Sequence, residues 1–327
     1  MSPDRKAFTA KDAVREVKAA AERIAPHVRE TWLEQSQHFS AVLGANVYFK
    51  MENLQHTGSF KARGALNKVL SLSPEELSRG VVAASTGNHG AAAAYAAGIA
   101  KSHAVVFVPE NASPDKLRTV GRLGAEVRFH GDDCMVAELF ARRYAADNGM
   151  AYISPYNDPL VVGGQGTIGI ELARQLDTID AVFVSLGGGG LISGIAAYLE
   201  SVRPGAQIVG CSPENSQVMI KSVEAGKILD LPSLPTLSDG TAGGVEAGSI
   251  TFNLCRKLVD DYVTVTEEAI AESWREFSTS HHMMIEGAAA VAVAALMKNR
   301  DRFAGQNVVV VLCGANIGMN SIRAMLP

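Results

Sequence analysis

The chain has 327 residues, of which 47% are hydrophobic and 20% charged, and its formal net charge is -4. This composition is typical of a globular protein and disfavours nucleic acid and anionic membranes as partners, because both attract basic surfaces. The length allows one large α/β fold or two domains. The charged amino terminus lacks the apolar stretch of a secretory signal, so we expect a cytoplasmic protein. The four cysteines and eight histidines show no metal-site spacing, and no metal is predicted.

The apolar pattern predicts alternating helices and strands, starting with a helix over residues 11–24. Strands are then predicted at 47–51, 81–85, 104–109, 125–130, 181–186, 207–212 and 308–313. Helices are predicted at 61–72, 89–100, 113–123, 166–177, 190–202, 267–281, 285–298 and the carboxyl terminus. A further long helix follows the strand at 125–130 and ends at about residue 147. Such alternation is typical of βαβ units in a parallel sheet. Residues 226–262 break the pattern, which indicates a functional loop or a disordered connector.

The strongest local signal is SLGGGGLISG, residues 185–194, where four glycines follow an apolar strand and precede a helix. Glycine allows close backbone approach, and a helix start presents unpaired N–H groups, so the segment predicts a phosphate site. A dinucleotide fingerprint is disfavoured because Ser193 stands where the pattern GxGxxG requires its third glycine. GQGTIG at 164–169 fits that pattern literally, but a poor strand precedes it, and the motif alone is weak.

Two further polar clusters follow predicted strands. In ASTGNHG, residues 84–90, a helix start and polar side chains suit a carboxylate, although an ordinary capping turn explains them equally well. In LCGAN, residues 312–316, Cys313 and Asn316 lie beyond the carboxyl end of the last strand, where open α/β sheets bind ligands. Taken singly, Cys313 is also a typical core residue. Lys61 in GSFKARGA, residues 58–65, is equally ambiguous, since most lysines are solvated surface charges.

Together, GSFKARGA, STGNHG, GGGGL, IEGAAA and LCGAN stand in an order and spacing that resemble the fold type II pyridoxal-phosphate enzymes. The resemblance is specifically to the serine and threonine dehydratases with serine racemase, and it runs from about residue 11 to the end. It implies two open twisted, mostly parallel sheets flanked by helices, as in the tryptophan synthase beta-like fold. It further implies a large cofactor-binding domain of residues 1–79 plus 158–327, a small inserted domain of residues 80–157, and a homodimer.

The resemblance also implies the roles of individual residues. Lys61 would carry pyridoxal 5'-phosphate as a Schiff base and act as general base, with Phe60 beside the pyridine ring. The substrate carboxylate would be held by Ser85, Thr86, Asn88 and His89, and Asn88 would also contact the cofactor's ring hydroxyl. The other cofactor contacts would be Gly187, Gly188, Gly189, Gly190 and Leu191 around the phosphate, Glu286 near the cofactor, and Cys313 facing the pyridine nitrogen.

Physical reasoning agrees with this assignment at two points. The positive end of a helix disfavours an added cation, so we expect the pKa of Lys61 to lie below its ordinary value. The Cys313 thiol is no carboxylate that would keep the pyridine nitrogen protonated, which favours β-elimination over transamination.

The expected activity is therefore that of a lyase: dehydration of a β-hydroxy amino acid such as L-threonine or L-serine to a 2-oxo acid and ammonia. A racemase or a β-replacing synthase of the same fold stays open. Thr86 carries a hydroxyl at the place where serine racemase, by the resemblance, uses a serine as its second acid/base, but the extra methyl of threonine favours dehydration. A nicotinamide-dependent dehydrogenase is the alternative from another class. Relatives with a divalent cation carry acidic residues after the strand that ends here at Cys211, but Glu214 is displaced from that place. The segment SDGTAGGVEAG, residues 238–248, is expected to border the pocket for the substrate side chain.

Overall fold

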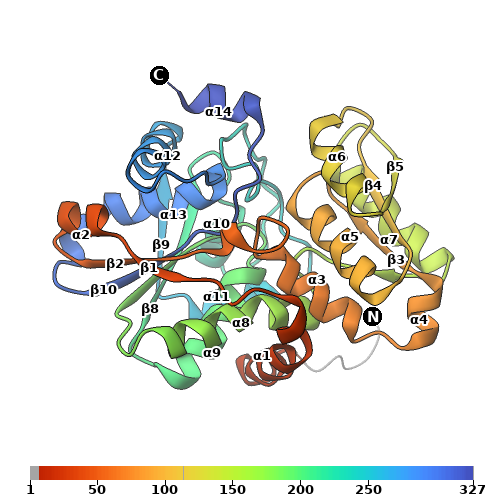
Figure 1. Cartoon of the computed structure of the whole chain (residues 1–327), viewed down its shortest axis with the longest axis horizontal. Coiled ribbons are helices and arrows are strands. Elements are labelled where there is room, and N and C mark those ends of the chain that lie inside the picture. The colour runs from red at the N-terminus through yellow and green to blue at the C-terminus, as the bar shows by residue number, and fades with distance from the viewer. Residues whose placement is uncertain (1–6, 113, 327) are drawn as a thin grey trace.

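The computed structural model describes residues 7–112 and 114–326, and in this part of the chain the strands form two sheets (Figure 1). The six-stranded sheet has the order β1-β2-β10-β7-β8-β9, and the four-stranded sheet has the order β5-β4-β3-β6. The strands are β1 (Leu33–Gln35), β2 (Asn46–Lys50), β3 (Val81–Ala84), β4 (Ala104–Val108), β5 (Glu126–Phe129), β6 (Ala151–Tyr152), β7 (Ala181–Ser185), β8 (Gln207–Pro213), β9 (Asp261–Val265) and β10 (Asn307–Val311).

Helices surround both sheets. They are α1 (Ala10–Ile24), α2 (Gln37–Leu43), α3 (Lys61–Leu70), α4 (Pro74–Arg79), α5 (Asn88–Ala100), α6 (Pro114–Arg122), α7 (Cys134–Asp147), α8 (Pro159–Gln175), α9 (Gly190–Val202), α10 (Val218–Ala225), α11 (Ile250–Leu258), α12 (Glu267–His281), α13 (Gly287–Lys298) and α14 (Met319–Met325). Three short 3-10 helices are η1 (Ala25–His27), η2 (Glu52–Leu54) and η3 (Arg300–Arg302). No helix in the described part of the chain has both the length and the apolarity to cross a membrane.

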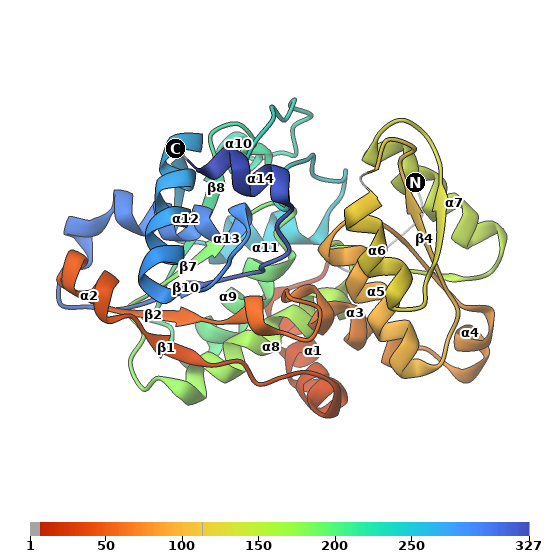
Figure 2. The same cartoon turned by 45° about the horizontal axis from the view of Figure 1, so that its top comes forward.

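The central strands of the six-stranded sheet, β10, β7 and β8, are buried on both faces, and this explains their apolar residues. β1 pairs with β2 antiparallel, and the other neighbours pair parallel. Helices α12 and α13 lie on one side of the sheet, while α1, α8 and α9 lie on the other (Figures 1 and 2). Parallel strands covered on both faces favour continuous apolar runs, as in β10, where the four residues from Val308 to Val311 are fully buried.

The four-stranded sheet is all parallel, and its side chains alternate between two separate cores. Val81 and Ala83 of β3 pack on the same side as the alanines of α5. Val82 points to the other side, where it meets α7 at Ala141 and Ala145. This alternation follows from the two-residue period of a strand.

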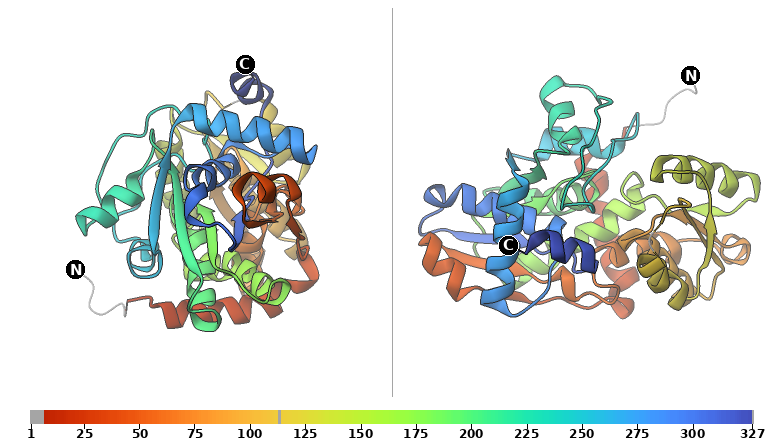
Figure 3. Two further views of the ribbon diagram at one scale, coloured as in Figure 1. Left: turned by 90° about the vertical axis from the view of Figure 1, so that its left-hand side faces the viewer. Right: turned by 90° about the horizontal axis from the view of Figure 1, so that it is seen from above.

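The predicted fold class, two open and mostly parallel sheets flanked by helices, is confirmed. All strands of the six-stranded sheet lie within residues 1–79 and 158–327, and all strands of the other sheet lie within 80–157. The domain boundaries themselves stay a prediction. Helix α3 packs against α5 on one side and α8 on the other, so it lies between the two sheets (Figures 2 and 3).

Two predicted segments differ from the structure. The helix predicted at 166–177 begins earlier, at Pro159, because the Asp158 side chain accepts hydrogen bonds from the N–H groups of Leu160 and Val161 and so caps its start. The irregular segment predicted at 226–262 contains helix α11 and the first residues of β9. Residue 113, where the helix predicted at 113–123 begins, lies outside the described residues.

The motif GQGTIG lies inside α8 and serves helix packing. An added Cβ on Gly164 would meet the carbonyl oxygen of Arg63 in α3 at 2.4 Å. A Cβ on Gly166 would meet Val17 of α1 at 2.4 Å and the backbone of Gly194 in α9 at 2.9 Å. Real Cβ atoms do not approach that closely, so these glycines allow three neighbouring helices to contact α8.

We therefore expect Gly166→Ala to lower the free energy of unfolding by about 1–2 kcal/mol, because overpacking outweighs the better helix propensity of alanine. Gly205→Ala is the matched control, since no heavy atom lies within 4 Å of its added Cβ. Urea unfolding followed by circular dichroism measures both variants. Equal stability of the two variants would contradict this role of Gly166.

Candidate active site

A cavity of about 510 Å³ lies where the carboxyl ends of strands from both sheets meet. Its wall includes the residues that follow β3, β4, β7 and β10. Such crevices at the carboxyl ends of strands are the usual ligand sites of open α/β folds. Every residue predicted from the sequence lines this cavity: Phe60, Lys61, Ser85, Thr86, Asn88, His89, Gly187, Gly188, Gly189, Gly190, Leu191, Glu286 and Cys313.

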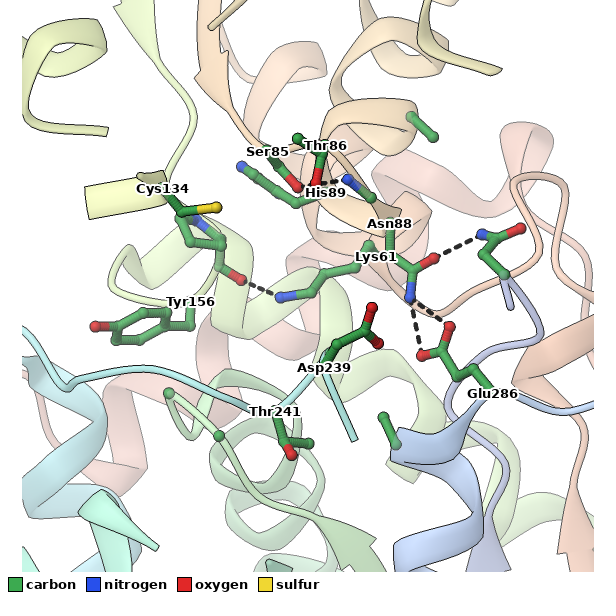
Figure 4. A pocket seen from close by; sticks show the side chains of 18 of the residues that line it. Lys61, Ser85, Thr86, Asn88, His89, Cys134, Tyr156, Asp239, Thr241 and Glu286 are labelled. Carbon is green, nitrogen blue, oxygen red and sulfur yellow. Dashed lines mark hydrogen bonds between the residues drawn. The ribbon is translucent and has the colours of Figure 1, made fainter. Parts of the chain in front are cut away.

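Lys61 is the first residue of α3, and its side chain enters the cavity (Figure 4). Its Nζ donates a hydrogen bond to the carbonyl oxygen of Pro155 at 2.8 Å and lies 5.1 Å from the centre of the Phe60 ring. Desolvation lowers the pKa of Lys61 to about 8, although the nearby Glu286 carboxylate favours the charged form. The direction is the one predicted from the sequence, but the largest cause is burial.

A buried network of charges fixes α3 just behind Lys61. The Arg63 guanidinium pairs with Glu52 at 2.7 Å and with Glu171 of α8 at 2.6 Å. Lys50 of β2 also contacts Glu171, at 2.5 Å. Two cations and two carboxylates thus balance one another, and the pKa of Arg63 is raised because its two carboxylates outweigh desolvation. Sequence reasoning missed this network, although the arginine two residues after Lys61 in GSFKARGA was its visible sign.

A chain of hydrogen bonds joins the start of α5 to the other sheet. The Asn88 amide donates to both carboxylate oxygens of Glu286, each at 2.9 Å, and its oxygen accepts from the amide of Asn316 at 2.6 Å (Figure 4). The Cys313 thiol lies 3.8 Å from the Glu286 carboxylate. Burial raises the pKa of Glu286 to about 7, against the hydrogen bond from Asn88, which lowers it. This buried carboxyl therefore changes protonation near neutral pH.

His89 is held as a neutral imidazole. Its Nε2 lies 2.8 Å from the carbonyl oxygen of Ile153, and a carbonyl can only accept, so Nε2 carries the proton and donates. Desolvation and the charge of Lys61 lower the pKa of His89 to about 3. Because its pKa is this low and its Nε2 proton is held by the Ile153 carbonyl, the His89 ring does not act as a base near neutral pH. It instead fixes the loop of Ser85 and Thr86 against the strand end of β6.

The four consecutive glycines are required by close contacts. Gly189 adopts the left-handed region at φ +83° and immediately precedes α9. An added Cβ on Gly188 would meet the Tyr156 ring at 2.4 Å, and one on Gly187 would meet the Thr241 carbonyl oxygen at 2.8 Å. These glycines line the cavity at the start of α9, where the first N–H groups of a helix have no intrahelical partner, and such a helix start suits an anion.

Several residues of the wall were not singled out from the sequence. Tyr156 and Glu138 carry no motif that marks them, because they reach the cavity only through the packing of α7 and of the segment after β6. Asp239, Gly240 and Thr241 belong to the segment 238–248, which was expected to border the substrate pocket, and they line the same cavity.

The lowered pKa of Lys61 predicts its reactivity. In the cofactor-free protein, acylation of Lys61 by a small amine-reactive reagent should reach half its maximal rate at pH about 8. The neutral amine is the nucleophile, and its fraction rises with pH. An ordinary lysine reaches that point at about 10.4. Peptide mass spectrometry against pH measures this, with exposed Lys257 as the internal reference. A half-maximal pH for Lys61 above about 10 would refute the expected desolvation.

Comparison with known proteins shows the family to which the chain belongs. The family model described as "Pyridoxal-phosphate dependent enzyme" matches residues 24–314. An L-threonine ammonia-lyase of Thermotoga maritima is 40% identical over 95% of this chain and 77% of its own length, and a serine racemase of Arabidopsis thaliana is 36% identical over 94% and 93%. The structure of processed threonine deaminase isoform 2 from Solanum lycopersicum has a TM-score of 0.92 at 32% identity, covering 97% of this chain and 92% of that one. The chain therefore belongs to the family of pyridoxal-phosphate dependent enzymes.

Proposed function

We propose that this protein is a pyridoxal-phosphate dependent ammonia-lyase that converts a β-hydroxy amino acid, such as L-threonine or L-serine, to a 2-oxo acid and ammonia. The observation that carries the proposal is the position of Lys61. Its amine has a lowered pKa and lies in one cavity with a glycine-rich helix start and a second polar helix start. The identity of 40% and 38% to two L-threonine ammonia-lyases supports dehydration over racemisation.

The residues of the cavity fit the cofactor. Pyridoxal phosphate needs an amine for its aldehyde, a site for its phosphate and a flat space for its ring. Lys61 offers the amine, and the turn Gly187–Gly190 offers backbone N–H groups at the start of α9. A side chain on Gly187 or Gly188 would collide with Thr241 or Tyr156, so this turn requires glycine at both positions.

The start of α5 suits the substrate carboxylate. Ser85, Thr86 and the N–H groups at the first turn of α5 line the cavity on the side of the four-stranded sheet. An anion is favoured there by the helix dipole and by hydroxyl donors. Because His89 is neutral and donates to Ile153, it keeps this loop in place without adding a charge. A carboxylate bound here would orient the α-carbon toward Lys61.

The chemistry follows from the state of two groups. When bound, pyridoxal phosphate supplies the electron sink that allows loss of the α-proton. Lys61 Nζ, with a pKa of about 8, can hold and release that proton near neutral pH, as a general base should. Burial raises the pKa of the Cys313 thiol, so Cys313 is neutral and offers no negative charge to a protonated pyridine nitrogen. This supports elimination of the β-hydroxyl over transamination.

Serine dehydratase activity, a homodimeric state and a cytoplasmic location stay predictions. Racemisation is the second candidate because Thr86 lines the cavity and carries a hydroxyl, and because a serine racemase is among the relatives.

The purified protein supplied with pyridoxal phosphate should release 2-oxo acid and ammonia in equal amounts from L-threonine or L-serine. Lys61→Ala should lower kcat/KM by about 10²–10⁴, the contribution typical of a general base, or by more if cofactor binding is also lost. Lys257→Ala, at an exposed position of α11, is the control. Formation of the mirror-image amino acid without 2-oxo acid, or full activity in Lys61→Ala, would overturn the proposal.

A further inference from the structure

A buried hydroxyl lies behind the glycine turn at the start of α9. Thr251, in the first turn of α11, is fully buried, and its Oγ1 donates a hydrogen bond to the carbonyl oxygen of Gly188 at 2.6 Å. An added Cβ on Gly189 would meet the Cβ of Thr251 at 3.2 Å and the sulfur of Cys255 at 2.9 Å. α11 therefore packs directly against this turn, beside α9 (Figures 1 and 2).

The hydrogen bond from Thr251 sets the direction of one peptide group. The peptide between Gly188 and Gly189 is trans, and in a trans peptide the C=O and N–H groups point in opposite directions. Since the Gly188 carbonyl points to Thr251, the N–H of Gly189 points away from α11. Both glycines line the cavity, whereas no residue of α11 does. The N–H of Gly189 is thus directed to the side of the turn on which the cavity lies.

A second hydroxyl repeats this arrangement two residues earlier. Ser212 of β8 is buried, and its Oγ donates to the carbonyl oxygen of Leu186 at 2.8 Å. The next N–H, that of Gly187, therefore points away from Ser212, and Gly187 lines the cavity whereas Ser212 does not. Within the part of the chain that the structure describes, the N–H groups of Gly187 and Gly189 have no hydrogen-bond acceptor. Both groups are therefore available to an anion.

Ser249 strengthens the hydrogen bond from Thr251. The Thr251 proton goes to the Gly188 carbonyl, which can only accept, so Ser249 is the donor in the contact of 2.7 Å between the two hydroxyls. Ser249 is also buried, and hydrogen bonds joined in such a chain polarise one another. The polarised peptide presents a stronger N–H donor at Gly189.

A turn of four glycines has many accessible backbone conformations, and the wrong one would harm phosphate binding. If the peptide between Gly188 and Gly189 turned over, its carbonyl oxygen would face the phosphate and repel it. On the basis of the proposed function, we infer that Thr251 and Ser212 are positioning residues for the cofactor phosphate. Their hydroxyls hold two carbonyls of the turn away from the cavity, and the N–H groups of Gly187 and Gly189 then face the phosphate. Among the described residues that line the cavity neither hydroxyl side chain occurs, so both act through the backbone.

Pyridoxal 5'-phosphate and pyridoxal test this role, because both carry the aldehyde and only the first carries the phosphate. Absorbance titration of the cofactor-free protein measures the Kd of each. Thr251→Val keeps the shape and removes the hydroxyl, so the Kd of pyridoxal phosphate should rise about five- to twentyfold, as expected when a hydrogen bond to a charged group is weakened. The Kd of pyridoxal should stay within about twofold, since it lacks the charged group. Ser212→Ala should show the same selective loss, and Thr251→Ser, which keeps the hydroxyl, should bind both compounds as the wild type does.

Ser102→Ala is the matched control. The Ser102 hydroxyl also donates to a backbone carbonyl, that of Leu77 at 2.7 Å, but it does not line the cavity, and its loss should change neither Kd. The inference is overturned if Thr251→Val weakens both compounds alike or neither. If Thr251→Val fails to fold, the same result in Ser212→Ala overturns it. Either result, with normal cofactor binding by the wild type, refutes this inference alone, whereas a wild type that never acquires cofactor absorbance refutes the proposed function.

Discussion

The site depends on burying one amine whose hydrogen-bond partner, among the described residues, is a carbonyl oxygen and not a carboxylate. Lys61 and Arg63 stand two residues apart at the start of α3, and they point to different surroundings. Arg63 is fully buried and forms ion pairs with Glu52 and Glu171, so its guanidinium stays protonated. Lys61 is enclosed in the cavity with a carbonyl oxygen as its hydrogen-bond partner, so its charged form is destabilised. Arg63, with its two ion pairs, holds the helix in place, whereas Lys61, hydrogen-bonded to a neutral carbonyl, becomes reactive.

The arrangement of the two sheets provides the rest of the cavity. The carboxyl ends of β3 and β4 face those of β7 and β10 across it, and α3 lies between the two sheets. Asn88 and Glu286 join the two sides by paired hydrogen bonds. Since Glu286 has a pKa of about 7, the strength of this contact depends on pH within the physiological range. Binding, orientation and proton transfer thus draw on groups from both sheets.

Sequence reasoning predicted the parts of the fold and site that rest on local pattern. Apolar periodicity gave most strands and helices, and motif order gave Lys61, the glycine turn and the loop Ser85–His89. It did not give Glu138, Tyr156 or the network of Arg63, because these depend on long-range packing, and Arg63 alone stands in a motif that was singled out. It also placed the start of α8 too late, since Asp158 and Pro159, which cap this helix, stand in a stretch that was interpreted as a poor strand. The long segment 226–262 concealed α11 for a similar reason, its Pro and Gly content outweighing a short helical pattern.

The most direct test of the central claim is to locate the cofactor on the chain. The protein loaded with pyridoxal phosphate is reduced with borohydride and digested, and the modified peptide is identified by mass spectrometry. The account predicts a phosphopyridoxyl group on Lys61, within the peptide that contains GSFKARGA. A modification found on Lys50 or on surface lysines, with Lys61 unmodified, would contradict it.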